Sequence, residues 1–193
     1  MTKMKKLPSI GLCLLGSGAV GKSCLAVQYH HGIFEEHDYD PTIQDVHRKN
    51  VRLNDKREYC LEIQDTAGEP ELRGLLEEII ETSEGFMIVY SVLDKRSFEE
   101  VTLFLDMIWK VRGKEVPIML VANKIDTLST EQARVISKED AQRLAHIHQL
   151  MYQETSAKTG ENVKTSFVAL AEKARDNMIL TGKLKKPSGC QIA

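Results

Sequence analysis

A glycine-rich loop between a buried strand and a helix is the feature that most constrains this sequence. The apolar run from Ile10 to Leu15 predicts a buried strand, and the chain continues as Gly-Ser-Gly-Ala-Val-Gly-Lys-Ser, which fits the phosphate-binding pattern G-x-x-x-x-G-K-[ST]. Backbone N–H groups in such a loop curl around phosphate oxygens, and the helix N-terminus adds partial positive charge. The residues expected to surround a bound nucleotide here are Gly16, Ser17, Gly18, Ala19, Val20, Gly21, Lys22, Ser23 and Cys24.

Apolar runs alternate with helix-length segments along the rest of the chain. Buried or extended strands are predicted at Tyr59 to Ile63, Phe86 to Val92, Ile118 to Ala122 and Met151 to Thr155. Two sets of apolar residues recur at helical spacing: Phe98, Val101, Leu105 and Ile108, and Phe167, Leu170, Ala174 and Met178. This order predicts an α/β fold of the P-loop type, with a mostly parallel six-stranded sheet and helices on both faces.

Two extended runs in the first half predict a hairpin at one edge of that sheet. Val46 to Leu53 and Arg57 to Gln64 are joined at Asn54-Asp55, a dipeptide typical of turns. The first run is rich in basic side chains, as an exposed antiparallel edge strand often is. These charged side chains could simply protect the edge from aggregation, or the free backbone groups of the strand could receive a partner.

Composition limits the classes of function. The 193 residues, 42% of them hydrophobic, suit one domain, which we predict over 8–180 with a flexible tail over 181–193. A formal net charge of -2 argues against nucleic acid as a partner. Lys3, Lys5 and Lys6 before an apolar run imitate a secretory signal, but the run is too short, and the cysteines show no metal-site or disulfide pattern.

Three segments carry acidic or hydroxyl side chains that could bind a metal ion. Asp65, in Asp-Thr-Ala-Gly, comes after a buried strand and therefore lies beside the phosphate loop, where it could hold Mg²⁺ through water. Ser23 could bind the same ion directly. Thr42, in Tyr-Asp-Pro-Thr-Ile, is a candidate second hydroxyl ligand from a loop that could order around a γ-phosphate.

Two later segments indicate guanine as the base. Asn123-Lys124-Ile125-Asp126 and Ser156-Ala157-Lys158 each follow a strand and so belong to the same edge of the sheet. A carboxylate at Asp126 can accept hydrogen bonds from the ring N–H and the exocyclic amine of guanine, whereas adenine would leave it unpaired. A P-loop kinase acting on a small molecule would not explain these two segments together.

With the motifs GSGAVGKS, YDPTI, DTAG, NKID and SAK, the chain resembles the Ras branch of the small GTPases over roughly residues 8 to 180. The resemblance implies GTP and GDP as ligands, slow hydrolysis, and control by exchange factors, activating proteins and effectors. Lys22 would contact the β- and γ-phosphates, Gly68 would sense the γ-phosphate, and Gly18 would admit an arginine finger. Phe34 and Lys124 would sandwich the guanine and Ala157 would donate to its carbonyl. The implied nucleotide site further includes Tyr39, Pro41, Asn123, Ser156 and Lys158.

The sequence departs from that family at the position that orients the attacking water. Glu69 stands where a glutamine is usual, and Pro70 follows it. A carboxylate can still accept a hydrogen bond from water, but it adds negative charge beside the γ-phosphate, so the rate could move either way. We therefore expect a GTPase, and keep as the alternative a guanine-nucleotide-binding interaction protein that hydrolyses poorly.

Two other segments bear on partners. There is one more residue between Phe34 and Tyr39 than Ras itself has, and Gln44, Val46 and His47 replace residues of its effector-facing segment. Asp45 is retained at the matching position, so an effector could still pair near Thr42 to Arg48. At the C-terminus, Cys190-Gln191-Ile192-Ala193 fits the prenylation pattern C-a-a-X loosely. We expect a prenyl anchor on Cys190 that holds the protein at the cytoplasmic face of a membrane, most simply the plasma membrane. A solvated basic tail with an incidental cysteine is the alternative.

Overall fold

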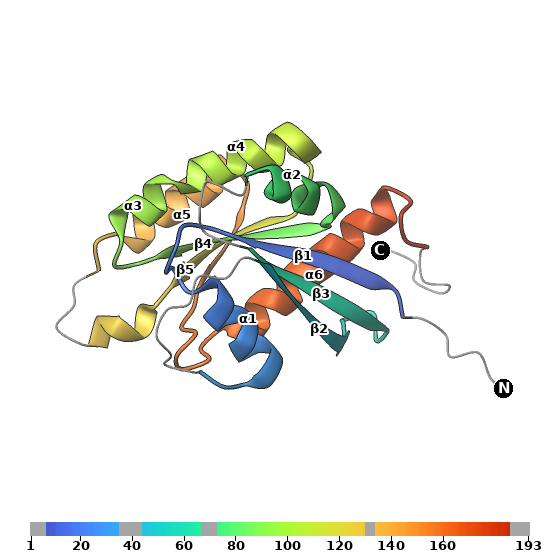
Figure 1. Cartoon of the computed structure of the whole chain (residues 1–193), viewed down its shortest axis with the longest axis horizontal. Coiled ribbons are helices and arrows are strands. Elements are labelled where there is room, and N and C mark those ends of the chain that lie inside the picture. The colour runs from blue at the N-terminus through green and yellow to red at the C-terminus, as the bar shows by residue number, and fades with distance from the viewer. Residues whose placement is uncertain (1–6, 35–43, 67–72, 130–133, 186–193) are drawn as a thin grey trace.

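The computed structural model describes residues 7–34, 44–66, 73–129 and 134–185, which form a six-stranded sheet between two layers of helices (Figure 1). The sheet has the order β2-β3-β1-β4-β5-β6, with β2 antiparallel to β3 and every other pair parallel. This confirms the predicted fold class. The strands are β1 (Ser9–Leu15), β2 (Gln44–Arg52), β3 (Glu58–Thr66), β4 (Gly85–Ser91), β5 (Ile118–Asn123) and β6 (Met151–Glu154).

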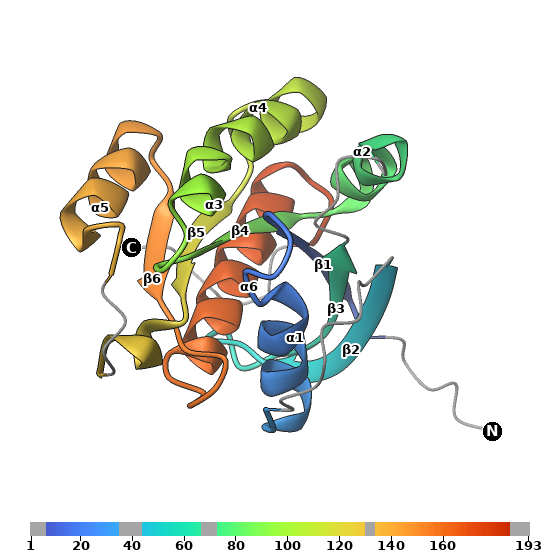
Figure 2. The same ribbon diagram turned by 60° about the vertical axis from the view of Figure 1, so that its left-hand side comes forward.

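The helices divide between the two faces of the sheet (Figures 1 and 2). One face is covered by α1 (Lys22–His31) and α6 (Val163–Leu180), and the other by α2 (Arg73–Thr82), α3 (Lys95–Glu99), α4 (Val101–Arg112) and α5 (Lys138–Ile147). A 3₁₀ helix, η2 (Ile125–Ser129), follows β5. Since β1 and β3 to β6 are parallel, their carboxyl ends share one edge of the sheet.

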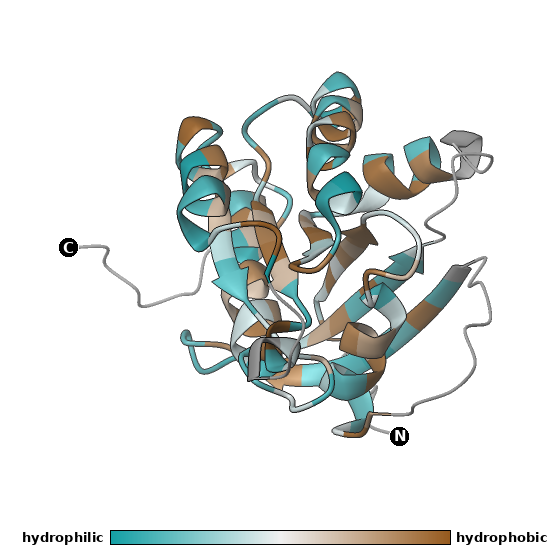
Figure 3. Ribbon diagram, turned by 90° about the vertical axis from the view of Figure 1, so that its left-hand side faces the viewer, coloured by the Kyte–Doolittle hydropathy of each residue, from teal (hydrophilic) through white to brown (hydrophobic). Residues whose placement is uncertain are grey.

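Alternation along the central strand explains why both layers are needed. Ile10, Leu12 and Leu14 of β1 pack with α1 and α6, whereas Cys13 and Leu15 pack with α2, α4 and α5. Central strands of this kind are apolar on both faces and cannot face water on either. In Figure 3 the inner strands are mostly hydrophobic, while the surrounding helices alternate hydrophobic and hydrophilic positions.

Two local predictions differ in detail from the structure. The apolar set from Phe98 to Ile108 predicted one helix, but α3 ends at Glu99 and α4 begins at Val101. Glu100 between them keeps helical angles and its N–H bonds to the carbonyl of Arg96, so the spacing continues across the junction. The β2–β3 turn includes Leu53 to Arg57, and its positive φ falls on Lys56 rather than on Asn54 or Asp55.

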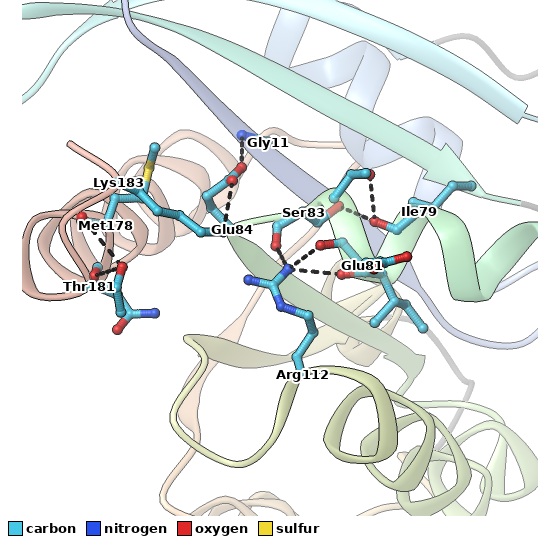
Figure 4. A network of polar contacts seen from close by, with 12 residues as sticks. Gly11, Ile79, Glu81, Ser83, Glu84, Arg112, Met178, Thr181 and Lys183 are labelled. Atoms are coloured by element: carbon cyan, nitrogen blue, oxygen red, sulfur yellow. Dashed lines mark hydrogen bonds and ion pairs between the residues drawn. The ribbon is translucent and has the colours of Figure 1, made fainter.

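An arginine joins α4 to the end of α2 (Figure 4). The guanidinium of Arg112 donates to the carbonyls of Ile80 and Glu81 at 3.0 and 2.9 Å, and also to that of Ser83. The last carbonyls of a helix have no partner within it, and a cation there also suits the helix dipole. Arg112 therefore fixes the C-terminal end of α2, the helix that follows residues 67–72.

The last described residues fold back onto the base of the sheet. The Leu184 N–H bonds to the Met178 carbonyl at 3.0 Å, and the Leu184 side chain packs on the cluster beneath α6. Lys183 lies 3.8 Å from Glu84, which in turn accepts a hydrogen bond from the Gly11 N–H (Figure 4).

Among the residues that the structure describes, none of the helices combines the length and the hydrophobicity of a membrane-spanning segment.

Candidate functional site

The loop after β1 is held in the shape that a phosphate requires. Gly16 and Gly21 have φ angles of 143° and 97°, which residues with a Cβ rarely adopt. A Cβ on Gly16 would collide with the carbonyl of Val89, and one on Gly21 would lie 2.5 Å from the Asn123 amide nitrogen. The close approach of β4 and of the last residue of β5 thus requires glycine at both positions.

Lys22 begins α1 with its ammonium group buried inside this loop. Its side chain is only 6% exposed, and Nζ donates to the carbonyls of Gly16 and Ser17, each at 2.9 Å. Burial lowers the pKa of Lys22 to about 8, against the opposing charge of Asp65. A phosphate group beside Nζ would supply the negative charge that this buried cation lacks.

Asp65 and Ser23 fit a divalent cation. Asp65 is 1% exposed, and its Oδ1 is buried without a hydrogen-bond partner among the described residues. Burial raises the pKa of Asp65, while a hydrogen bond with Ser23 and the charge of Lys22 act in the other direction. A buried oxygen without a donor, next to a serine hydroxyl, is the oxygen chemistry that Mg²⁺ selects, so the residues present fit the predicted metal.

Asn123 connects the phosphate loop to the loop after β6. Its amide nitrogen donates to the carbonyl of Val20 at 2.9 Å, and its Oδ1 accepts from the Thr155 hydroxyl and the Ala157 N–H, both at 3.2 Å. The residue is 1% exposed. One side chain therefore fixes the distance between the place for the phosphates and the place for the base.

The predicted base-binding residues gather beside it. The Ser156 hydroxyl donates to Asp126 Oδ1 at 2.6 Å, which fixes the orientation of that carboxylate. Lys124 has a positive φ of 70° and its Nζ donates to the Ala19 carbonyl at 2.7 Å. The Ala157 N–H is already bonded to Asn123, so a guanine carbonyl would have to share this donor. Lys158 follows as an exposed residue.

Several predicted residues lie at the margin of the site or outside the described ranges. Cys24, in the first turn of α1, is half-buried, and burial raises the pKa of its thiol. Phe34 packs against the cluster beneath α1 and is the last residue before 35–43. The residues outside the described ranges are Tyr39, Pro41, Thr42, Gly68, Glu69, Pro70 and Cys190.

Sequence reasoning did not find the polar groups that support these loops. Glu154, at the end of β6, is held by Arg134 at 2.7 Å, and the Ser17 hydroxyl donates to Glu100 at 2.6 Å. Glu154 is 20 positions from Arg134 and Glu100 is 83 from Ser17. No short motif links residues so far apart.

Comparison with known proteins places this geometry in a family. The family model described as "Ras family" matches residues 11–176, a range that contains the phosphate loop, Asp65 and both base-binding loops. The chain belongs to the Ras family of small GTPases. This family assignment confirms the resemblance drawn from the motifs.

Two fungal relatives of this Ras-family chain show how far the similarity extends. It is 39% identical to "Ras-like protein 1" of Saccharomyces cerevisiae over 167 residues, which cover 86% of the chain and 52% of the yeast protein. It is 38% identical to "Protein ras-1" of Neurospora crassa over 165 residues, covering 85% of the chain and 75% of that protein. The yeast relative is therefore almost twice as long as the region it shares with this Ras-family chain.

Proposed function

We propose that this Ras-family protein binds GTP and GDP together with Mg²⁺ and works as a switch that GTP hydrolysis resets. The observation that carries the proposal is the placement of Asn123, whose amide is bonded both to the phosphate loop and to the loop carrying Ala157. A site that holds phosphates and base at one fixed separation is what a nucleotide requires, and the Asp126 carboxylate selects guanine.

The chain's own residues would divide the work of the reaction. Lys22 would neutralise charge on the β- and γ-phosphates, and the glycine loop would hold them with backbone N–H groups. Ser23, Thr42 and, through water, Asp65 would hold Mg²⁺, which when bound neutralises charge on the transferring phosphoryl group. Gly68 would sense the γ-phosphate, and Glu69 would orient the attacking water.

The base end of the site would act through Asp126, with Phe34 and Lys124 on the two faces of the ring. Ser156 supports this role because it fixes the Asp126 carboxylate at 2.6 Å. Bound GTP would order the loops around Thr42 and Gly68, and hydrolysis would release them. We propose that exchange factors and activating proteins control this cycle, and that effectors bind near Thr42 to Arg48. This range includes the first residues of the edge strand β2, where Asp45 and Arg48 are exposed.

The test of hydrolysis compares the natural protein with Glu69→Gln in a single turnover of preloaded GTP with Mg²⁺. The proposed switch requires that the natural protein convert GTP to GDP at least as fast as the variant, with the Glu69 carboxylate accepting a hydrogen bond from the water. If GTP persists for hours and the variant restores turnover, the alternative function holds, namely a guanine-nucleotide-binding protein that rarely hydrolyses.

We further propose that Cys190 carries a prenyl group, which terminal alanine favours as farnesyl, and that it anchors the protein at the cytoplasmic face of the plasma membrane. A single chain anchors reversibly, and Lys183, Lys185 and Lys186 would add attraction to anionic lipid. Cys190→Ser should abolish farnesyl incorporation, measured by mass spectrometry, and shift the protein into the soluble fraction. Equal membrane recovery of both forms would contradict the proposal.

A further inference from the structure

The phosphate loop is bonded on its outer side to an acid from the α3–α4 junction. The Ser17 hydroxyl donates to Glu100 Oε2 at 2.6 Å, and Arg96 Nε donates to Glu100 Oε1 at 2.8 Å. Both oxygens of the Glu100 carboxylate are therefore engaged, one by the loop and one by a cation on α3. The first contact joins residues 83 positions apart.

Through Ser17 this contact reaches the ammonium group at the centre of the site. The Ser17 side chain is held by Glu100, while its backbone carbonyl accepts a hydrogen bond from Lys22 Nζ at 2.9 Å. A movement of Glu100 would therefore turn the Ser17 peptide and shift one of the two carbonyls that orient Lys22.

A carboxylate next to a phosphate-binding loop needs a counter-charge. The hydrogen bonds from Ser17 and Arg96 hold the pKa of Glu100 below its usual range, so this group is ionised at neutral pH. Glu100 has 26% of its side chain exposed. The start of α3 fixes where Arg96 lies, because the Arg96 N–H bonds to Asp94 Oδ1 at 3.0 Å.

We propose that Glu100 and Arg96 are positioning residues for bound nucleotide, Glu100 by orienting Ser17 and Arg96 by screening the Glu100 charge from the phosphates. The proposal rests on the nucleotide-binding function above. It assigns to α3 a part in phosphate binding that none of the nucleotide motifs contains, because neither residue belongs to a loop that receives the nucleotide.

The same helix offers a matched control. Lys95 and Glu99 form an ion pair at the same spacing, 3.4 Å apart, with 74% and 62% of their side chains exposed. A pair so exposed contributes little. Substitutions there change the charge at α3 and the α3–α4 junction in the same way as substitutions of Arg96 and Glu100, but they leave the Ser17 contact in place.

The experiment measures dissociation of a fluorescent GDP analogue from the full chain with Mg²⁺ and excess unlabelled GDP. Glu100→Ala should release the analogue on the order of ten times faster, because a charge-assisted hydrogen bond to Ser17 is lost. Glu100→Gln should speed release less than Glu100→Ala does, since the amide oxygen of glutamine still accepts a hydrogen bond from the Ser17 hydroxyl. Arg96→Met should speed release less than Glu100→Ala, because the Arg96 side chain is 85% exposed and water also screens its charge, and its effect should be larger for a non-hydrolysable GTP analogue than for GDP. Glu99→Ala and Lys95→Met should stay within about twofold of the natural rate.

Two further readouts separate positioning from general loosening. The ³¹P resonances of bound GDP should shift in Glu100→Ala but not in Glu99→Ala, since only the former turns the loop. Arg96→Met should have no added effect in a Glu100→Gln background, because the charge that it screens is gone. This second comparison still decides if Glu100→Ala does not fold.

The outcomes are distinct from failure of the proposed function. If the natural protein binds GDP but Glu100→Ala releases it at the Glu99→Ala rate, the positioning role is wrong and the nucleotide function stands. Additive effects of Arg96→Met and Glu100→Gln would equally overturn it. Failure of the natural protein to bind GDP would instead remove the proposed function itself.

Discussion

Asp126→Asn is expected to lower the affinity for GDP on the order of a thousandfold. The guanine ring N–H and amine would both donate to the Asp126 carboxylate, and the change replaces one accepting oxygen by an amide group that donates. The same variant should gain affinity for xanthosine diphosphate, whose ring has a carbonyl where guanine has the amine. The Ser156 hydroxyl, 2.6 Å from Asp126 Oδ1, can still bond to the amide, so the loop should keep its shape. Competition against a fluorescent GDP analogue measures both affinities.

Asp106→Asn is the matched control, because this carboxylate is exposed on α4 away from the site. It removes the same charge and should leave GDP affinity unchanged. ADP should compete poorly with GDP on the natural protein. Effective displacement of GDP by ADP would argue against the guanine assignment, and so would equal GDP affinity in Asp126→Asn and the natural protein.

Asn123→Ala is expected to damage both halves of the site at once. The change leaves the Val20 carbonyl, the Thr155 hydroxyl and the Ala157 N–H buried without their partner. Unpaired buried polar groups cost about 1–3 kcal/mol each, so we expect the free energy of unfolding to fall by at least about 2 kcal/mol. GDP should also dissociate tens of times faster, a change in rate that corresponds to about 2 kcal/mol.

Urea unfolding and GDP dissociation measure these two effects, with Asn50→Ala on the exposed edge strand as the control. Hydrogen exchange adds a local readout, since the Ala157 amide should lose protection in Asn123→Ala. Should Asn123→Ala resemble Asn50→Ala in both measurements, the link between the two loops would contribute nothing.

The buried strands could be predicted from sequence because parallel strands covered on both faces leave an uninterrupted apolar run, as Phe86 to Val92 does. The edge hairpin could be predicted because the dipeptide Asn54-Asp55 is typical of turns, although the positive φ of the turn falls on Lys56. The break at Glu100 could not be predicted, because that residue keeps helical angles and the apolar spacing passes through it. Helix α5 buries mainly Ala141 and Ala145, which give little periodic signal.

The site was predictable to the extent that its motifs follow strands. The motifs GSGAVGKS, DTAG, NKID and SAK lie at or directly after the carboxyl ends of β1, β3, β5 and β6, and parallel strands bring these ends to one edge, so these loops meet there. The motif YDPTI does not follow a strand in the sequence, so this rule does not place it. No sequence pattern indicates the hydrogen bonds between these loops. The bond from Asn123 to the Ala157 N–H, and that from Ser17 to Glu100, depend on side-chain directions that only the folded chain sets.

The docking of Leu184 and Lys183 at the base of the sheet has a mechanical consequence. A pull on the chain beyond Lys185 reaches the molecule first at the Leu184 N–H, the Glu84 ion pair and the buried length of α6. An 18-residue helix spans roughly 27 Å, and its far end begins next to the loop after β6. A force applied to the tail would therefore act first on the hydrophobic core, at the end of α6 that is far from the nucleotide-facing loops.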